Sequence, residues 1–445
     1  MNRKLRSLYL SLTLDQRIIA FKRMLVELRR QLTLRKRVVH VFLQIDDPYS
    51  YLLSHYLEFV MQRYKLVEFR FYLCQALRGD FSPEPAMQAE YAVVDCRMLA
   101  EELGVPFLDR GAAPAVEYRR PLLDFLADEH DDEDFGPLFN KALTAYWRGD
   151  AEAVARLIGQ VMPEQAATNV LVGKNQLMLR KMGHYNCATM HYADEWFWGV
   201  DRLQYLTDRF ADQGLDRYKE ETPELAALAQ VTSVNLPANK PTRAGELPPL
   251  EMFHSFRSPY SFIALPRIFQ IADAFGLNLN VRPVLPLVMR GKAVPRAKVL
   301  YIVRDANREA ITLGVPFGEF ADPVGIGTER CMAAFEYAQE QGRGRRFLLA
   351  AGEAIWSKAI DVATDEGMEK VAKRAGLAWP EVQAALQHDG WRKAAEANRE
   401  ALTEAALWGV PSFKIGELAM WGQDRIWLLA RRLQDVYRDD ADGRA

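Results

Sequence analysis

The chain has 445 residues, of which 49% are hydrophobic and 26% charged, and its formal net charge is −2 at pH 7. This length predicts two domains rather than one core, and the balanced charge gives no indication of a nucleic-acid partner. No apolar run reaches the roughly 18 to 20 residues of a membrane span, and the N-terminus lacks the apolar core and cleavage site of a signal peptide. We therefore expect a cytoplasmic protein without an integral membrane segment.

Residues 1–37 are strongly basic, with eleven Lys or Arg against two Asp or Glu. Apolar residues such as Ile18, Phe21, Leu25 and Leu28 recur at helical spacing, which predicts a basic N-terminal helical segment. Two interpretations are open. The helix packs on the folded body and shows a solvated basic face, or it binds a membrane surface or an anionic partner.

Three blocks of sequence occur twice in the same order. "DPYSYLLSHYLEF" from Asp47 resembles "SPYSFIALPRIFQ" from Ser258, "YAVVDCRMLAEELGVPF" resembles "YIVRDANREAITLGVPF", and "WGVDRLQYL" resembles "WGQDRIWLL". Because the offset of about 210 residues far exceeds the period of a solenoid, the pattern predicts a tandem duplication. We assign domains to residues 38–210 and 250–438, with a linker over residues 211–249, and the Pro-rich segment Val234–Leu250 marks the boundary between the halves.

Each half has the same predicted order of elements. In the first half, a β-branched strand over Val38–Ile45, a helix from Tyr49 and a strand over Val67–Cys74 form a β-α-β unit. In the second half, residues 409–422 predict two short strands around a Gly-Glu turn. A β-α-β unit, a helical insertion and a β-β-α unit describe an α/β protein of two tandem thioredoxin-like domains, each with an inserted helical subdomain.

The turn Ser258-Pro-Tyr-Ser261 spaces two serines as C-x-x-C spaces two cysteines. The four cysteines are scattered, without C-x-x-C or metal-ligand spacing, so we expect reduced, buried thiols and no metal site. In such a fold this turn begins a helix, whose N-terminus stabilises an anion. A serine hydroxyl there can donate a hydrogen bond to the thiolate of a bound thiol and lower the pKa of that thiol from about 8.5.

Four motifs of the C-terminal half follow one family pattern. They are Ser258-Pro-Tyr-Ser261, Pro295-x-x-Lys298-x-x-Tyr301, Gly409-Val-Pro-Ser412 and Trp421-Gly-Gln-Asp-Arg425. In this order and spacing they resemble those of the kappa-class glutathione transferases and the 2-hydroxychromene-2-carboxylate isomerases, relatives of the DsbA-type thioredoxin fold.

The resemblance implies glutathione as cofactor, with Ser258 as the catalytic residue that hydrogen bonds to its sulfur. Pro411 would be cis, so that the backbone of Val410 pairs with the cysteinyl unit. Lys298 would meet the glycyl carboxylate. The Asp424 side chain would meet the γ-glutamyl ammonium, and backbone N–H groups of Gln423 and Asp424 its α-carboxylate.

Each assigned residue also has a purely structural interpretation. Ser258 could be only an N-cap, Lys298 a solvated charge, Pro411 a tight-turn residue and Asp424 a helix cap. Their joint occurrence in the order of the family favours the binding roles.

The first half departs from the pattern at the same points. Asp47 stands in place of Ser258, Gln88 in place of Lys298, and "GHYN" (residues 183–186) in place of Gly409-Val-Pro-Ser412, which puts Tyr185 at the cis-proline position. We expect this half to have lost glutathione chemistry, and the two halves to pack as an intramolecular pseudo-dimer with one competent site. The alternative is that Asp47 marks a different activity.

The resemblance implies a glutathione-dependent isomerase or transferase acting on a small electrophilic or aromatic-derived acceptor. The aromatic residue and the amide in Trp421-Gly-Gln-Asp-Arg425 favour the isomerase branch. The alternative is a non-catalytic thioredoxin-fold scaffold that binds glutathione or a protein.

Overall fold

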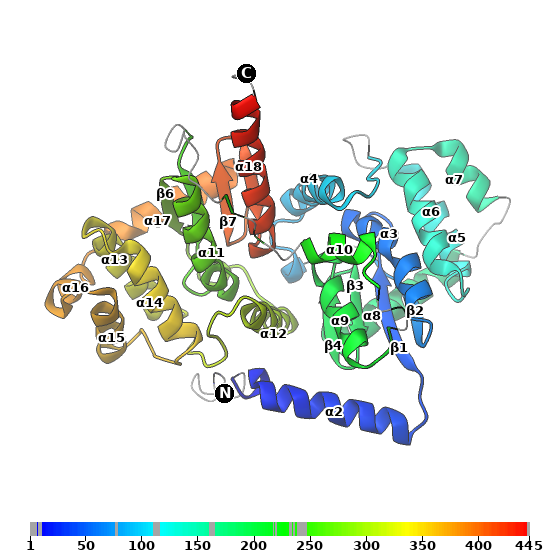
Figure 1. Ribbon diagram of the computed structural model, residues 1–445, viewed down its shortest axis with the longest axis horizontal. Coiled ribbons are helices and arrows are strands. Elements are labelled where there is room, and N and C mark those ends of the chain that lie inside the picture. Colours follow the sequence, from blue (N-terminus) through cyan, green and yellow to red (C-terminus); the bar gives the residue numbers. More distant parts are fainter. Residues whose placement is uncertain are drawn as a thin grey trace. The chain divides into compact units, whose positions relative to one another are not determined.

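The computed structural model describes residues 7, 11–75, 79–109, 116–159, 165–216, 218, 220–230, 234, 236–237 and 247–442. The chain forms two compact units, each with its own sheet and its own helices (Figure 1). The first unit contains residues 21–232. The second unit combines residues 1–20 with residues 233–445.

The first unit contains a four-stranded mixed sheet with the order β2-β1-β3-β4. Its strands are β1 (Arg37–Leu43), β2 (Val67–Leu73), β3 (Thr189–Tyr192) and β4 (Glu195–Trp198). Strands β1 and β2 are parallel and are joined by α3 (Pro48–Arg63), whereas β3 and β4 form an antiparallel hairpin next to β1. Because β1 is central, Val39, Val41 and Leu43 are completely buried.

The second unit repeats this topology in the order β6-β5-β7-β8. Its strands are β5 (Leu250–His254), β6 (Leu279–Pro283), β7 (Ser412–Ile415) and β8 (Leu418–Trp421). Helix α11 (Pro259–Phe275) joins the parallel strands β5 and β6, and α18 (Ile426–Asp442) follows the hairpin. The predicted β-α-β and β-β-α units are both present.

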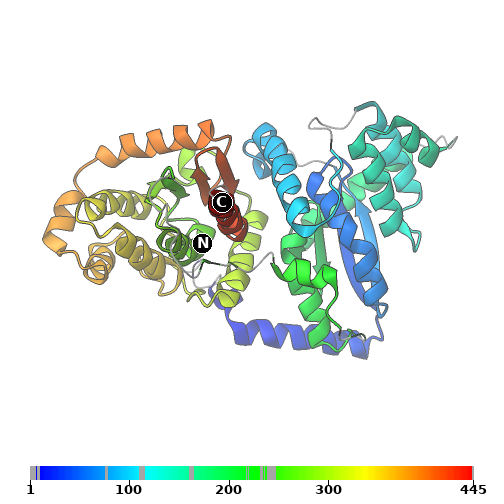
Figure 2. The ribbon, with the colours of Figure 1, turned by 45° about the horizontal axis from the view of Figure 1, so that its top comes forward.

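Helices fill the long insertion of each unit. The remaining helices of the first unit are α4 (Pro85–Leu103), α5 (Val116–Asp128), α6 (Phe135–Arg148), α7 (Ala151–Ile158), α8 (Gln165–Met182), α9 (Leu203–Asp212) and α10 (Pro223–Gln230), with the 3₁₀ turns η1 (Gly79–Phe81) and η2 (Val200–Arg202). Those of the second unit are α12 (Arg296–Thr312), α13 (Ile326–Glu340), α14 (Gly344–Trp356), α15 (Asp365–Ala375), α16 (Trp379–Ala385) and α17 (Gly390–Glu404), with η3 (Leu287–Arg290) and η4 (Gln423–Arg425). Figure 2 shows α5, α6 and α7, in teal, gathered into one helical body.

A buried polar contact recurs at matching positions of the repeated blocks. Tyr49 at the start of α3 donates its hydroxyl hydrogen to Asp95 Oδ2 of α4 over 2.8 Å. Tyr260 at the start of α11 makes the same bond to Asp305 Oδ2 of α12 over 2.7 Å. Both aspartates are almost completely buried. The similarity of the two halves therefore extends from the sequence blocks to individual side-chain contacts.

The predicted basic helix is present as α2 (Gln16–Leu32), and several of its apolar residues are exposed. None of its residues is buried, and Phe21, Met24 and Leu28 are 56%, 55% and 46% exposed. Arg23 forms a bidentate pair with Glu195 of β4, with N–O distances of 2.7 and 2.8 Å. Ion pairs therefore tie the helix to the first unit, whereas Phe21, Met24 and Leu28 remain largely exposed.

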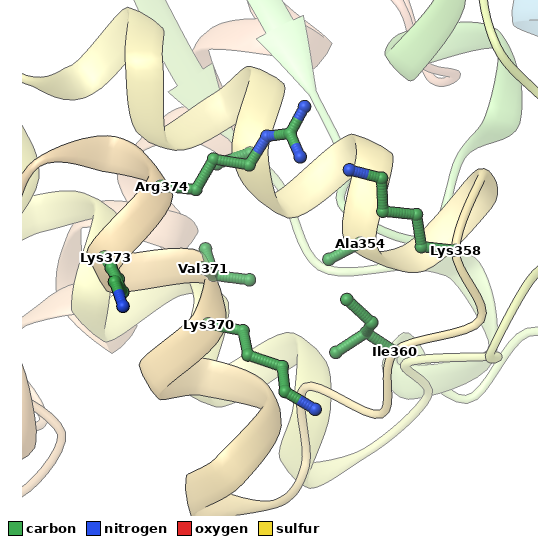
Figure 3. Close-up of a pocket in the computed structure, with 8 residues that line it drawn as sticks. Ala354, Lys358, Ile360, Lys370, Val371, Lys373 and Arg374 are labelled. Carbon is green, nitrogen blue, oxygen red and sulfur yellow. The ribbon is translucent and has the colours of Figure 1, made fainter.

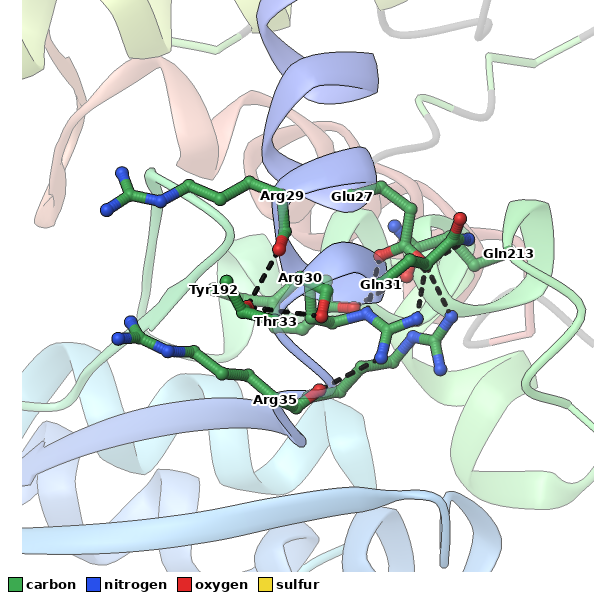
Figure 4. Close-up of polar contacts among 9 residues, drawn as sticks. Glu27, Arg29, Arg30, Gln31, Thr33, Arg35, Tyr192 and Gln213 are labelled. Atoms are coloured by element: carbon green, nitrogen blue, oxygen red, sulfur yellow. Dashed lines mark hydrogen bonds and ion pairs between the residues drawn. The ribbon is translucent and has the colours of Figure 1, made fainter.

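Polar contacts also fix the C-terminal end of α2 (Figure 4). Glu27 accepts hydrogen bonds from Arg30 over 2.7 and 2.9 Å and from Arg37 of β1 over 2.7 Å. Arg30 also donates to the carbonyl oxygen of Arg35 over 2.9 Å. One carboxylate thus connects the helix to the first strand, and the two arginines hold the pKa of Glu27 below its usual value.

The predicted linker over residues 211–249 begins too early, because the first unit continues to residue 232. Helix α10 packs against α4 and α9, and its Leu228 is buried. Arg63 of α3 pairs with Asp216 over 2.7 Å and donates to the Glu220 carbonyl oxygen over 2.7 Å. The polar segment before α10 is therefore tied to the unit by a largely buried ion pair. Most of the predicted Pro-rich linker lies outside the described residues.

Within the described ranges, no helix combines the length and the apolar character needed to cross a bilayer.

Substitution of Arg63 by methionine is expected to leave Asp216 without its cation in a mostly buried place. The cost should be about 2 kcal/mol in the free energy of unfolding of the first unit, below the range for fully buried pairs because Asp216 remains partly solvated. Urea unfolding and limited proteolysis between residues 213 and 222 measure it. The control is Lys370→Met, which removes an exposed i,i+4 partner of Glu366 and should change little. If both variants lowered the free energy of unfolding equally, the Arg63–Asp216 pair would not stabilise the first unit in the way described.

Candidate functional site

Ser258 is the N-cap of α11. Its Oγ accepts a hydrogen bond from the Ser261 backbone N over 3.1 Å and donates one to the Val410 carbonyl oxygen over 3.4 Å. The second serine of the turn, Ser261, is buried, and its Oγ accepts a hydrogen bond from the Ser255 backbone N over 3.4 Å. Ser258 is thus an N-cap, which is the purely structural role considered for it from the sequence. Its donor hydrogen bond is at the long, weak end of the range, so the hydroxyl hydrogen can turn to a better acceptor.

The loop before β7 brings Val410 to this turn. The peptide bond between Val410 and Pro411 is cis, as the resemblance implies. Gly409 has no room for a side chain, since a Cβ there would lie 2.4 Å from Nε1 of Trp421. The Gly422 backbone N donates to the Pro411 carbonyl oxygen over 2.9 Å. The motifs at 409–412 and 421–425 are therefore in contact through the β7–β8 hairpin.

An ion pair fixes the other side of the turn. Arg257 directly precedes Ser258 and forms a bidentate pair with Asp322, with N–O distances of 2.7 and 2.9 Å. The Asp322 Oδ1 atom also accepts a hydrogen bond from the Val324 backbone N over 3.2 Å. Bidentate arginine pairs restrict orientation as well as distance. The turn that presents Ser258 is thus held by the segment before α13.

Gln423 takes part in a buried polar network. Its side chain is in η4, where Nε2 donates to Glu309 Oε2 of α12 over 2.9 Å and Oε1 accepts from Arg267 of α11. Gln423 is 1% exposed and Glu309 6%. This network joins α11, α12 and η4, and it engages the Gln423 side chain within the protein. Any contact of Gln423 with a ligand therefore has to come from its backbone.

The sequence contains a signal for this network that motif analysis missed. Arg267 and Glu309 lie in the repeated blocks, at positions where the first half has Tyr56 and Leu99. Both of those residues are buried. A charged residue whose repeat partner is a core position indicates a buried polar contact, because an unpaired charge is costly there.

Lys298 and Asp424 lie on two elements that pack against α11. Lys298 is half-buried in the first turn of α12, and this burial lowers the pKa of its ammonium group to about 8. Asp424 is half-buried in η4, directly after Gln423. Lys298 is therefore not the solvated surface charge of its structural interpretation.

The strand register corrects the predicted correspondence between the two halves. Phe42 of β1 pairs with Thr189, and Phe253 of β5 pairs with Ser412. The counterpart of Pro411 is therefore Ala188, not Tyr185. The Gly199 backbone N donates to the Ala188 carbonyl oxygen over 2.7 Å, just as Gly422 bonds to Pro411. Ala188 has a φ of +52°, so the chain turns sharply at this position.

The counterpart of Ser258 is confirmed by its position as Asp47, the N-cap of α3. Asp47 Oδ2 accepts hydrogen bonds from Ser50 N over 3.0 Å and from Ser50 Oγ over 2.7 Å. Burial raises the pKa of the Asp47 carboxyl group to about 6. Above that pH the N-cap residue carries a negative charge and has no hydroxyl group to donate to a ligand. It is unsuited to hold an external thiolate.

The polar network of the second unit is absent from its counterpart in the first. The register of the β3–β4 hairpin makes Val200 the counterpart of Gln423. Tyr56, Leu99 and Val200 are each at most 3% exposed. An apolar cluster thus replaces the Arg267–Gln423–Glu309 network.

Two tryptophans of the second unit, Trp356 and Trp421, have different surroundings. Trp356 stacks on Phe317 and Phe320, with ring centroids 5.8 and 5.4 Å away, and is a core residue. Trp421 is half-buried against Trp408, with the ring centroids 4.7 Å apart, and lies directly beside Gly409. Of the two tryptophans, Trp421 is the one positioned next to the site.

A separate pocket of about 270 Å³ lies between α14 and α15 (Figure 3). Its lining comprises Ala350, Ala354, Lys358, Ile360, Lys370, Val371, Lys373 and Arg374. Glu353 pairs with both Lys358 and Arg374, and Glu366 pairs with Lys370. The basic rim is therefore largely neutralised. None of the site residues predicted from the motifs lines this pocket.

In the part of the chain that the structure describes, no three His, Cys, Asp or Glu side chains gather in a metal-binding arrangement.

The family model of the DSBA-like thioredoxin domain matches residues 249–434. The chain is similar to 2-hydroxychromene-2-carboxylate isomerase of Pseudomonas putida, with 23% identity over 205 residues. The alignment covers 43% of this chain and 98% of the isomerase. The isomerase of the same name from Sphingobium xenophagum is 25% identical over 199 residues, again 98% of its length. A solved structure of a 2-hydroxychromene-2-carboxylate isomerase superposes with a TM-score of 0.39 at 22% identity, covering 43% of this chain and 98% of that one. The C-terminal half therefore has a DsbA-like thioredoxin fold and is similar to these isomerases.

Replacing Asp47 with asparagine is expected to stabilise the first unit at neutral pH. The pKa of the carboxyl group is about 6 when folded and about 3.9 when unfolded, so the folded state binds the proton more tightly and stability falls as pH rises between these values. Asparagine remains a good N-cap and removes the half-buried charge. We expect a gain of about 1 to 2 kcal/mol at pH 7 that vanishes below about pH 4, measured by urea unfolding at several pH values.

The control is Asp46→Asn, which removes the partner of Arg119 from the neighbouring position and should bring no gain. A gain for Asp47→Asn that is the same at pH 3.5 and pH 7 would show that the carboxylate charge is not its cause.

Proposed function

We propose that the second unit binds glutathione, activates its thiol at Ser258 and uses it in a cis-trans isomerisation like that named for its relatives. The acceptor would be a small, conjugated, electrophilic compound of aromatic origin. The observation that carries the proposal is the position of the Ser258 hydroxyl, at the N-terminus of α11 and 3.4 Å from the Val410 carbonyl oxygen. The similarity of residues 249–434 to the isomerases supports it.

Activation of the thiol would depend on the donor hydrogen of Ser258. A thiolate above the first turn of α11 faces the positive end of the helix dipole and can take over the hydrogen bond that now goes to Val410. Both effects favour the charged form of sulfur and lower the thiol pKa. The Val410 carbonyl group, once released, can accept a backbone N–H from the cysteinyl unit.

The ends of the tripeptide would be held by charges on α12 and η4. Lys298, with a pKa of about 8, is readily charged at neutral pH, and a glycyl carboxylate beside it would raise that pKa again. Asp424 would pair with the γ-glutamyl ammonium group. The network of Gln423 would keep η4 in the orientation that this contact needs.

The chemical step needs no redox change. The glutathione thiolate adds to one carbon of a conjugated double bond, which becomes a single bond and rotates, and elimination of the same thiolate restores the double bond in the other geometry. Transfer would be the same addition without elimination. Glutathione is regenerated in the isomerase reaction.

We also propose that the two units derive from a tandem duplication and that only the second retains this site. The matching sheet orders and the two Tyr–Asp bonds support the duplication. Two differences support the loss of the glutathione site from the first unit. Asp47 stands in place of Ser258, and an apolar cluster stands in place of the Gln423 network.

Titration of glutathione into the full chain, followed by calorimetry and by thiolate absorbance against pH, tests the proposed site. We expect one equivalent to bind, and Ser258→Ala to raise the pKa of the bound thiol by about one unit, equivalent to one hydrogen bond to a charged group. Isomerisation of a conjugated aryl pyruvate should then slow at least about tenfold at neutral pH.

Asp47→Ala is the matched control, because it changes the corresponding position of the first unit and should leave glutathione binding unaltered. Absence of glutathione binding to the wild-type chain would exclude this function. Binding without turnover of any conjugated acceptor would favour the non-catalytic scaffold.

The role of the buried network can be tested by giving the second unit the apolar cluster of the first. The triple variant Arg267→Tyr, Glu309→Leu and Gln423→Val removes the two charged residues together, and it also removes the hydrogen bond that Gln423 Nε2 donates to Asp424. We expect glutathione to bind about tenfold more weakly because η4 loses its anchor, while the pKa of the bound thiol stays as in the wild type. A change in thiol pKa with unaltered affinity would contradict the assignment.

A further inference from the structure

Helix α2 carries a continuous row of exposed apolar side chains. Five large apolar residues share one face of the helix, because their spacing is i, i+3, i+4, i+7 and i+11. They are Phe21, Met24, Leu25, Leu28 and Leu32, and we call them the apolar stripe. Their exposed fractions run from 44% to 76%. All five belong to the first unit.

The ion pairs of α2 explain why the apolar stripe faces outward. Arg23 pairs with Glu195 of β4 over 2.7 Å. Arg30 pairs with Glu27, which also accepts a hydrogen bond from Arg37 of β1. At 3.6 residues per turn, Arg23 and Arg30 lie about 180° around the helix from the stripe. The sheet therefore holds the opposite face of α2, and the stripe points away from it.

Exposed cations border the apolar stripe. Lys22 and Arg29 lie seven residues apart along one edge of it, and Arg35 follows the helix. All three are exposed, and none of them pairs with a carboxylate in the part of the chain that the structure describes. In Figure 4 the side chains of Arg29 and Arg35 extend to the same side, away from Glu27. Residues 21–37 contain seven Lys or Arg and one Glu, so this surface has an excess of positive charge.

Leu34, in the turn after α2, is a further apolar residue that the fold does not explain. It is 91% exposed, and its φ is +51°. This region of φ favours glycine, because a Cβ atom is crowded there. Neither packing nor backbone geometry accounts for a leucine at this position. A contact made by the surface accounts for it.

We propose that α2 attaches the protein to the surface of a membrane that contains anionic phospholipids. The apolar stripe and Leu34 enter the boundary between the headgroups and the acyl chains. Lys22, Arg29 and Arg35 lie at the level of the phosphate groups, with their aliphatic stems in apolar surroundings. The helix lies in the plane of the membrane and does not cross it.

The charge of this surface favours lipid over a second copy of the chain. Two copies paired through the apolar stripe would bring Lys22 and Arg29 near the same residues of the other copy, and like charges repel. An anionic lipid surface neutralises these cations, and each Lys or Arg near it strengthens binding about fivefold. A row along one helix can also contact a planar surface over its whole length.

Flotation of the full chain with lipid vesicles tests the proposal. One set of vesicles is phosphatidylcholine, and the other contains about 30% phosphatidylserine, which supplies the negative surface potential. We expect binding to the phosphatidylserine vesicles at about 0.1 M salt and at least about tenfold weaker binding at about 1 M, because the Debye length shortens from about 10 to 3 Å. Binding to phosphatidylcholine alone should be at least about tenfold weaker as well.

Two double variants separate the contributions of charge and apolar contact. Lys22→Gln with Arg29→Gln should weaken binding to phosphatidylserine vesicles about tenfold or more and reduce its dependence on salt. Leu25→Gln with Leu28→Gln should weaken binding about tenfold or more and leave the dependence on salt in place. Glutamine is a good helix former, so both variants keep α2.

Leu34→Gly separates membrane binding from folding. Glycine suits a φ of +51°, so this variant should resist urea at least as well as the wild type and yet bind phosphatidylserine vesicles several-fold more weakly. The control is Leu177→Gln with Ile311→Gln, which changes apolar residues that are 52% and 51% exposed on α8 and α12. It should bind as the wild type does.

Three results would overturn the proposal. The first is absence of binding to phosphatidylserine vesicles at about 0.1 M salt. The second is a loss of stability in Leu25→Gln with Leu28→Gln, which would show that the chain itself covers the apolar stripe. The third is a concentration-dependent dimer without vesicles that the same variant abolishes, which would make a second copy the occupant. None of these results depends on glutathione binding.

Discussion

The capping of one helix N-terminus determines much of what each unit can do. In both units the helix after the first strand begins in a conserved geometry, with the cap residue bonded to the backbone N–H three residues later. Serine and aspartate satisfy this requirement equally well. They differ in what remains after capping, because Ser258 retains a donor hydrogen directed at Val410 whereas Asp47 adds a half-buried negative charge. The chemistry of each turn follows from that difference, while the fold tolerates either residue.

The second constraint is the way in which η4 or η2 is held against that helix. In the second unit, Arg267, Glu309 and Gln423 satisfy one another, and a fully satisfied polar network fixes orientation more narrowly than apolar packing does. In the first unit, Tyr56, Leu99 and Val200 fill the same place without directional bonds. A ligand that needs Asp424 in one orientation benefits from the network. In a unit without such a ligand, the apolar cluster is sufficient to fill the core.

The repeated blocks and their motifs predicted the β-α-β and β-β-α units, the helical insertions and the turn at Ser258, and the family resemblance implied the cis bond before Pro411. The exact correspondence of the two halves was not predictable, because no sequence in the first unit resembles the motif at residues 409–412. Only the pairing of Phe42 with Thr189 shows that Ala188 is the counterpart of Pro411. The extent of the first unit was underestimated because the polar segment after α9 is held by Arg63, 153 residues from Asp216 in the sequence. The exposure of Phe21 and Met24 could not be inferred from helical periodicity, which says which residues share a face and not what covers it.

Comparison of corresponding positions in the two units shows the same limit. The first unit has Asp47 and Cys187 where the second has Ser258 and Val410, and only the strand register reveals that Cys187 and Val410 correspond. A hydroxyl donor at the N-cap suits a sulfur that arrives with a ligand, because the donor stabilises a thiolate that the protein itself does not supply. A carboxylate at the same position opposes a thiolate, because two negative charges repel each other. The residue at the N-cap therefore decides whether the same fold can favour an external thiolate.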